Sequence, residues 1–297
     1  MVNYICPIDK LDLQVKEFGF VSSSGIEYKT VNIDGTEVFD FRCLDLTSSV
    51  SLEFQLPVDI ISEIDGWKNF GKATEANFKS LSREQFRKRF GTKLQKEVAY
   101  YLDFLFIKKG KTARILDLGC GDGATRNFLN SIGFEDVTCV DWYHKNADAL
   151  VDVHRLPYKS GTFDLILTTA CLEHFYNPFV AFSEMSRVLT EDGMLIASGS
   201  FWESWHGDSC FHSTPAGLKI LCQSADLELE DVWSGWGFLP SIASHAFGLS
   251  KFKRITYFLQ RVFDLLVRVI AGKDAVKKHK FRTSGSFGIF AVKNGGQ

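Results

Sequence analysis

Hydrophobic and polar positions follow different patterns in successive parts of the chain. Short segments in which apolar and polar residues alternate, separated by turn residues such as Asp34-Gly35, predict a small β unit over residues 1–45 with a hairpin at that turn. From Ser82 to Leu105, apolar residues recur every three or four positions, which predicts an amphipathic helix. We therefore expect a linker and a helical cap over residues 46–110.

Residues 111–297 alternate buried-type apolar runs with helical segments, which is typical of a doubly wound, mainly parallel α/β sheet. Helices are expected at 124–132 and after Asn177-Pro178 and Thr214-Pro215, because asparagine or threonine followed by proline commonly starts a helix. A helical insertion at about 238–284 is expected before the last strand. The seven predicted strands are 113–118, 137–141, 149–153, 163–169, 194–198, 227–233 and 287–292.

The composition is that of a globular protein. Hydrophobic residues make up 45% and charged residues 24% of the 297 residues, which excludes wholesale disorder and collagen-like or coiled-coil architecture. No apolar run approaches the roughly 20 residues of a membrane-spanning helix, and the N-terminus has no basic-then-apolar signal region. The seven cysteines are scattered without a Cys-x-x-Cys pair, as in a reducing compartment. We expect a soluble, cytoplasmic protein.

The strongest local signal is a glycine-rich turn after the first strand of the sheet. Residues 115–123, Ile-Leu-Asp-Leu-Gly-Cys-Gly-Asp-Gly, would let a ligand reach the backbone at the carboxyl edge of the sheet. Gly119, Gly121 and Ala124 also satisfy the loose dinucleotide pattern, and Asp141 lies about 20 residues further on, as a ribose ligand should. The turn by itself therefore leaves a NAD-dependent oxidoreductase open.

The charge around the turn distinguishes a negatively charged dinucleotide from a positively charged ligand. Asp117 and Asp122 flank the turn, and their carboxylates would repel a pyrophosphate but attract a ligand that carries an ammonium and a sulfonium group. Here the sequence resembles the class I S-adenosylmethionine-dependent methyltransferases, especially the group that includes ubiquinone-biosynthesis enzymes. The resemblance covers about residues 112–233 and rests on five motifs in order: residues 115–123, Asp141, residues 152–157 (Asp-Val-His-Arg-Leu-Pro), Phe163-Asp164 and Leu172-Glu173-His174.

The resemblance implies a cofactor, S-adenosylmethionine, whose product is S-adenosylhomocysteine. Asp117 would lie near its amino group, and Asp141 would accept both ribose hydroxyls. Trp142 would lie against the adenine, and Asp152 would accept a hydrogen bond from the adenine amino group. The residues implied in cofactor binding are Asp117, Gly119, Cys120, Gly121, Asp141, Trp142, Asp152, Val153 and Ala170. Only ten residues separate Asp141 from Asp152, so the helix usual after the second strand has shrunk to a loop, and we expect that edge of the sheet to be more open.

The reacting end of such a site chiefly has to align the acceptor and exclude water, so a base is optional. Histidine suits a general base because its pKa lies near neutral. Some ubiquinone-type enzymes join the glutamate-histidine pair to an earlier acid to hold a divalent metal, but Ala170 stands at that position here, so we predict no metal. The candidate catalytic residues, which follow the fourth and fifth strands, are Glu173, His174, His206, Asp208 and His212.

The N-terminal unit resembles the small zinc ribbons that precede some methyltransferase domains. A structural zinc needs four ligands, but only Cys6 is present, and Asp9 stands where the second cysteine would be. We therefore expect a degenerate ribbon without zinc.

The charge of the chain is unevenly distributed. The net charge is −2, yet residues 251–282 hold ten Lys and Arg against two Asp, or +8; with Lys293 at +1, residues 1–250 carry −11. An apolar face opposite basic residues at seven-residue spacing predicts an amphipathic helix over about 251–271. We expect a lid packed over the acceptor pocket, with peripheral contact to a membrane surface or contact with RNA as alternatives.

Together these inferences predict methyl transfer from S-adenosylmethionine to oxygen or nitrogen of a small-molecule, glycan or lipid-linked acceptor. A ribosomal or transfer RNA methyltransferase is the first alternative. A NAD-dependent oxidoreductase and a non-catalytic cofactor-binding protein are the others.

Overall fold

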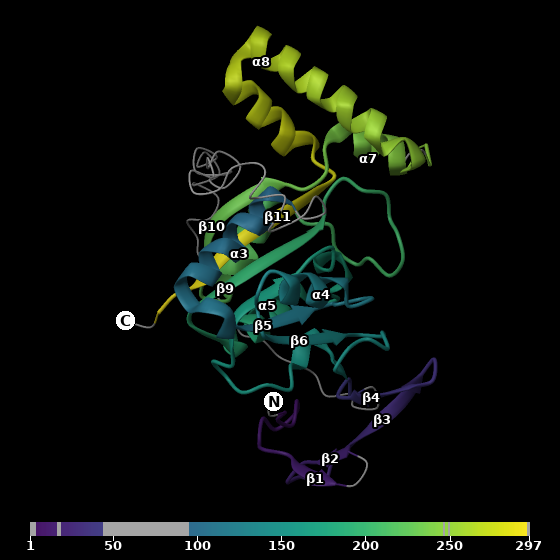
Figure 1. Cartoon of the computed structure of the whole chain (residues 1–297), viewed down its shortest axis with the longest axis vertical. Coiled ribbons are helices and arrows are strands. Elements are labelled where there is room, and N and C mark those ends of the chain that lie inside the picture. The colour runs from purple at the N-terminus through teal and green to yellow at the C-terminus, as the bar shows by residue number, and fades with distance from the viewer. Residues whose placement is uncertain (1–3, 17–18, 44–94, 246, 249, 296–297) are drawn as a thin grey trace.

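The computed structural model describes residues 4–16, 19–43, 95–245, 247–248 and 250–295. Within these residues, eleven strands form one sheet in the order β1-β2-β3-β4-β7-β6-β5-β8-β9-β11-β10 (Figure 1). Their bounds are β1 (Gln14–Lys16), β2 (Gly19–Val21), β3 (Glu27–Ile33), β4 (Thr36–Asp40), β5 (Arg114–Leu118), β6 (Asp136–Asp141), β7 (Ala149–Leu150), β8 (Phe163–Thr168), β9 (Leu189–Ser200), β10 (Leu227–Ser234) and β11 (Ser286–Lys293).

The seven strands from β7 to β10 correspond to the predicted strands. β5 to β9 run parallel to one another, whereas β11 is antiparallel to both of its neighbours, β9 and β10. The prediction of a mainly parallel, seven-stranded α/β sheet is therefore confirmed for this part of the chain. Because the parallel strands share one carboxyl edge, the segments that follow β5, β6 and β8 lie together there.

Helices cover both faces of this sheet. Consecutive strand residues point to opposite faces, so Ile115 packs with α3 (Lys96–Lys109) and α4 (Ala124–Ser131), and Leu116 packs with α5 (Pro178–Val188) and α6 (Pro215–Ser224). The two starts predicted from proline are confirmed by their caps. The Asn177 side chain accepts from the Val180 amide at 3.4 Å, and Thr214 Oγ1 accepts from the Gly217 amide at 3.0 Å.

Helix α3 is the C-terminal part of the predicted helical cap. It begins at Lys96 and ends at Lys109, where Gly110 adopts a φ of +73° that breaks the helix. The rest of the predicted helix, from Ser82, and most of the predicted linker lie outside the described residues.

The N-terminal β unit extends the sheet. Its hairpin forms at Asp34-Gly35 as predicted, with Ile33 opposite Thr36. Strand β4 pairs in parallel with β7, so the expectation that this edge would be more open was wrong. The exposed amides and carbonyls of an edge strand need partners, and the N-terminal unit supplies them. Cys6 is buried, and its thiol lies 3.1 Å from the hydroxyl of Tyr28.

The insertion between β10 and β11 contains α7 (Phe238–His245) and α8 (Lys253–Thr283). Gly272, with a φ of +87°, divides α8 into two halves that lie alongside each other at the opposite end of the molecule from β1 and β2 (Figure 1). The predicted lid is wrong in one respect: the large apolar residues of the first half, such as Leu266 and Val269, are exposed. Among the described helices, none combines the length and the hydropathy that crossing a membrane requires.

Candidate active site

The glycine turn after β5 adopts a backbone that only glycine accepts easily. Gly119, Gly121 and Gly123 have φ values of +78°, +51° and +77°. A Cβ on Gly119 would lie 2.6 Å from Cys171 Sγ, whereas one on Gly121 would meet nothing within 4 Å. The backbone at Gly121 thus faces open space, and a ligand can approach it closely.

Asp141, at the end of β6, is joined to this turn. Its Oδ2 accepts from the Gly121 amide at 2.9 Å, and its Oδ1 accepts from the Tyr143 amide at 2.9 Å. Each carboxylate oxygen has two lone pairs, so both retain capacity for a further donor. The structure therefore brings together the glycines and the predicted ribose ligand, in a position to accept two hydroxyl groups.

Asp117 is buried beneath the turn. Burial raises its pKa to about 7, and the thiol of Cys139, 3.7 Å away, opposes this only in part. A nearby ammonium group would favour the ionised form and reverse the shift. Cys120, in the turn itself, is also buried, and its pKa is raised by hydrogen bonding to Cys139 and by burial.

Asp152 lies buried after β7 and is held by residues that sequence reasoning missed. Its Oδ1 accepts from the amide of His154 at 3.0 Å and lies 2.5 Å from His154 Nδ1. The Asn177 amide donates to His154 Nε2 at 3.1 Å, so the ring proton is on Nδ1 and points to Asp152. Burial alone would raise the pKa of Asp152, but the hydrogen bonds from His154 lower it overall.

The hydroxyl of Tyr176 donates to the other oxygen of Asp152, Oδ2, at 3.1 Å. Val153, next along the chain, is nearly buried. These contacts leave Oδ2 with one lone pair for a ligand, so the adenine role of Asp152 stays a prediction. The sequence signal that could have revealed His154 is its place inside the motif of residues 152–157.

Trp142 follows Asp141 and is half exposed. The guanidinium of Arg42 lies 5.8 Å from the centre of its ring, and Arg42 Nη1 donates to the Trp142 carbonyl at 3.2 Å. Asp40 holds Arg42 through an ion pair of 2.6 Å. A residue of the N-terminal unit thus contacts the predicted adenine side of the site, which the sequence did not indicate.

The candidate catalytic residues gather at the neighbouring strand ends. Donor atoms of Glu173, His174 and His206 all lie within 4.8 Å of one another, and the ring of His212 lies 6.3 Å from that of His206. The amides of Cys210 and Phe211 donate to the Glu173 carbonyl and so tie this loop to the end of β8. Asp208, by contrast, is exposed, and no contact of its carboxylate within the described residues joins it to the cluster.

Glu173 is the most buried member of this cluster. Its Oε1 accepts from Ser200 Oγ at 2.8 Å and lies 3.7 Å from His206 Nε2. Its Oε2 is buried without a hydrogen-bond partner among the described residues. Two imidazoles and one carboxylate form a donor set that suits a divalent cation such as Zn²⁺, and the same groups can also accept and hold a proton.

A cavity of about 300 Å³, lined mainly by polar residues and called here the polar cavity, lies beside the histidine cluster. It is bounded by Ala170, which the resemblance assigns to the cofactor, and by His206, a candidate base. Its other walls include Thr169, Glu173, Ser200 and Glu203. The cavity thus provides a space beside Glu173 and His206, and Ala170 is the predicted cofactor residue that lines it.

Residues 116–197 match a family described as "Methyltransferase domain". The chain is 32% identical over 138 residues to malonyl-[acyl-carrier protein] O-methyltransferase of Geobacter sulfurreducens, covering 39% of this chain and 51% of that one. It is 34% identical over 96 residues to norajmaline N-methyltransferase of Rauvolfia serpentina, covering 26% and 32%. The chain thus spans about half or less of the length of these relatives.

Among solved structures, phosphoethanolamine N-methyltransferase 2 of Haemonchus contortus in complex with S-adenosyl-L-methionine aligns with a TM-score of 0.40. The identity is 17%, and the alignment covers 70% of this chain and 56% of that one.

Proposed function

We propose that this chain is a class I S-adenosylmethionine-dependent methyltransferase, which transfers the methyl group of S-adenosylmethionine to an oxygen or nitrogen atom of an acceptor; the match of residues 116–197 to a methyltransferase domain supports this. The observation that carries the proposal is the hydrogen bond between Asp141 and the Gly121 amide, beside open space over Gly121. It joins the two motifs that such a cofactor requires at one edge of the sheet.

The cofactor supplies an activated methyl group on a positively charged sulfur, and the protein supplies the rest. Asp141 accepts the ribose hydroxyls with the free lone pairs of both oxygens. Asp117 pairs with the amino group of the cofactor, and the positive charge of that ammonium favours the ionised form of the carboxylate. Asp152, held by His154, faces the adenine. These roles give each of the three carboxylates a donor on the ligand, and only Asp117 is assigned to a cationic group.

The acceptor occupies the polar cavity between Ala170 and His206. His206 takes the proton from the acceptor hydroxyl or amine, and the carboxylate of Glu173, 3.7 Å away, stabilises the imidazolium that forms. Ser200 keeps Glu173 oriented through its hydrogen bond to Oε1. The size of the cavity suits one polar group of a small-molecule, glycan or lipid-linked acceptor better than a folded macromolecule.

Calorimetry with S-adenosylhomocysteine tests the cofactor site. We expect Asp141→Ala to weaken binding by about tenfold or more, because two charge-assisted hydrogen bonds are lost. Asp136→Ala, at the exposed start of the same strand, is the matched control and should bind normally. Tight binding of NAD with no response to S-adenosylhomocysteine would overturn the proposal.

Chelation distinguishes proton transfer from metal chemistry at the cluster. If His206 acts as a base, turnover in a methyl-donor assay survives incubation with EDTA. Turnover lost with EDTA and restored by added Zn²⁺ would instead assign Glu173, His174 and His206 to a cation.

A further inference from the structure

The first half of α8 exposes a broad apolar surface. Between Ile255 and Ile270, large apolar side chains occupy one side of the helix, and Val269 and Ile270 are 76% and 83% exposed. Other members of this surface are Phe258, Leu259, Leu265 and Leu266. Contiguous apolar area of this kind on a protein surface commonly marks an interaction site.

Basic side chains border this apolar surface along one side. Arg254, Arg261 and Arg268 are spaced seven residues apart, which returns each to within about 20° of the previous one around the helix axis. All three are exposed. A helix with a wide apolar side bordered by basic residues is the arrangement found in helices that lie in a membrane interface.

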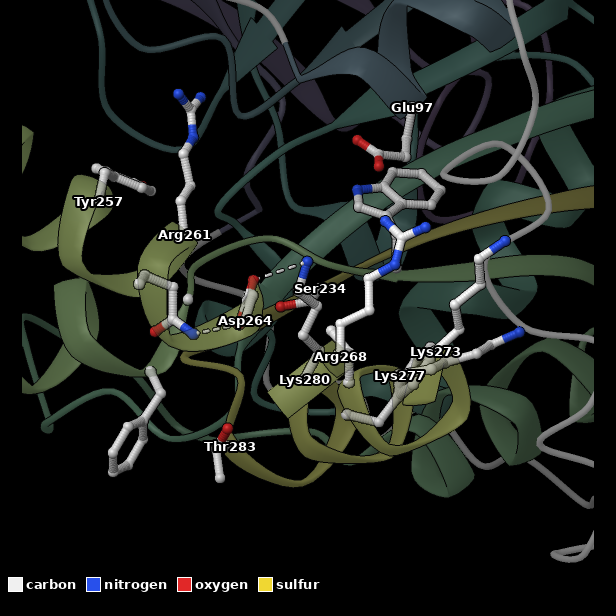
Figure 2. A pocket seen from close by; sticks show the side chains of 16 residues that line it. Glu97, Ser234, Tyr257, Arg261, Asp264, Arg268, Lys273, Lys277, Lys280 and Thr283 are labelled. Atoms are coloured by element: carbon white, nitrogen blue, oxygen red, sulfur yellow. Dashed lines mark hydrogen bonds and ion pairs between the residues drawn. The ribbon is translucent and has the colours of Figure 1, made fainter. Parts of the chain in front are cut away.

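A basic cavity of about 460 Å³ adjoins the same border. Figure 2 shows its lining, to which the two halves of α8 contribute Arg261, Arg268, Lys273, Lys277 and Lys280. Lys280 forms an ion pair with Asp264 at 3.1 Å. Within the described part of the chain, no carboxylate forms an ion pair with Arg261, Arg268 or Lys273. The cavity therefore presents cationic groups that are available to an anion.

We propose that α8 docks this protein on an anionic phospholipid surface, with its apolar side in the membrane interface and its arginine border and basic cavity against lipid phosphates. This inference goes beyond methyl transfer and does not depend on it. Charge complementarity favours this partner, because the +8 of residues 251–282 contrasts with the −11 of residues 1–250 and would orient the chain. Aliphatic side chains outnumber the aromatic Phe258 and Phe263 on the exposed side, which favours lipid over RNA, since RNA is bound through aromatic stacking and phosphate contacts.

Vesicle co-sedimentation of the full chain tests the proposal. We expect binding to phosphatidylcholine vesicles that contain about one third phosphatidylglycerol, and much weaker binding to pure phosphatidylcholine. Binding should fall steeply between about 0.1 M and about 1 M salt, because the Debye length shrinks from about 10 Å to about 3 Å.

Two double variants separate the apolar and the charged contributions. Leu266→Ser with Val269→Ser should weaken vesicle binding by about tenfold or more, since both side chains would leave the interface. Arg261→Gln with Arg268→Gln should weaken it by about 25-fold, from about fivefold for each charge. The affected side chains are exposed, so both variants should fold, which circular dichroism checks.

Matched controls change the same chemistry far from α8. Phe104→Ser with Ile107→Ser removes exposed apolar groups from α3, and Lys16→Gln with Lys29→Gln removes two charges from the N-terminal strands. Both should bind vesicles normally.

Three results would overturn the inference. The first is no binding to phosphatidylglycerol vesicles, or equal binding by the α8 variants and their controls. The second is a change of oligomeric state in Leu266→Ser with Val269→Ser while vesicle binding is unchanged, which would assign the surface to a second copy of the chain. The third is loss of poly(U) RNA binding, but not of vesicle binding, in Arg261→Gln with Arg268→Gln.

Discussion

Two cavities flank the segment that connects β10 to α7, and they are built in different ways. The polar cavity is bounded by Trp236 and by residues at the ends of parallel strands, such as Ala170 and Ser200. The basic cavity is bounded by Gly237 from the same segment, by Phe238 at the start of α7, and by the two halves of α8. In the first, the buried carboxylate of Glu173 and the partly buried carboxylate of Glu203 both contact the hydroxyl of Ser200.

This difference separates two ways of making a ligand site. In the polar cavity, Glu173 and its partners have few alternative positions, because strands and a tied loop hold their backbones. In the basic cavity, the charge is carried by long side chains of α8, of which Arg261, Arg268 and Lys273 are exposed and Lys280 is paired with Asp264. The first arrangement suits chemistry at one atom, and the second suits recognition of a diffuse negative surface.

The loop beside the polar cavity and helix α7 beside the basic cavity are in contact through aromatic side chains. Trp202, on the loop that carries His206, stacks on Phe238 of α7 with ring centres 5.6 Å apart. Docking of α8 on a membrane would therefore bring the loop beside the polar cavity close to the lipid surface, where a lipid-linked acceptor would be found.

The largest effect expected from this comparison is on turnover. His206→Ala should lower turnover by about 10²–10⁴-fold, because the proton acceptor of the polar cavity is removed. Affinity for S-adenosylhomocysteine should change less than about twofold. His279→Ala removes an imidazole on α8 and should leave turnover unchanged. A normal rate in His206→Ala, measured in a methyl-donor assay, would exclude His206 as the base.

The next effect concerns stability on the cofactor side. His154→Phe keeps an aromatic ring against Tyr176 but removes the donor to buried Asp152, and we expect the free energy of unfolding to fall by about 2 kcal/mol. Because the pKa of Asp152 is lowered in the fold, this stabilisation is present above about pH 4 and is lost as pH falls through the lowered pKa. Urea denaturation at neutral and acidic pH measures the loss of stability and its dependence on pH. Equal stability of the unmodified protein and His154→Phe at neutral pH would contradict the role of His154.

A smaller effect should appear in cofactor affinity. The pKa of Asp117 is about 7, so lowering the pH from about 7 to about 6 reduces the ionised fraction from about one half to about one tenth. Since an ammonium group binds the ionised carboxylate, affinity for S-adenosylmethionine should fall by about fivefold. Asp117→Asn should bind weakly at both pH values. Calorimetry that finds the same pH dependence in this variant would assign it to another group.

The smallest effect on turnover is expected when a residue of the basic cavity is changed. Arg268→Gln should leave turnover on a soluble acceptor within about twofold of the unmodified protein, because Arg268 lies outside the polar cavity. A large loss of turnover would join the two cavities into one acceptor site and end the distinction between them.

Much of the sheet could be predicted because its signals are local. The glycines at 119, 121 and 123 and the caps at Asn177 and Thr214 reflect backbone requirements of a few neighbouring residues. The alternation of Ile115 and Leu116 between two packed faces likewise follows from the strand period. The order of these motifs along one edge of the sheet therefore follows from local sequence patterns.

The pairing of β4 with β7 and the exposure of α8 could not be predicted in this way. Both depend on which distant segment reaches an edge or a face, and sequence periodicity describes only the segment itself. The amphipathic pattern of α8 correctly predicted a helix, but not whether its apolar side would be covered.

The alternating strand and helix segments of an α/β domain, the glycine turn with flanking carboxylates, and the amphipathic basic helix near the C-terminus could all be predicted from the sequence, because each has a pattern within one short segment. The three-dimensional fold was needed to show that Tyr176 contacts Asp152, that Arg42 reaches Trp142, and that Glu173 and His206 line the same cavity. Those contacts join residues from separate strand ends and loops, and their distances depend on how the whole sheet twists and packs.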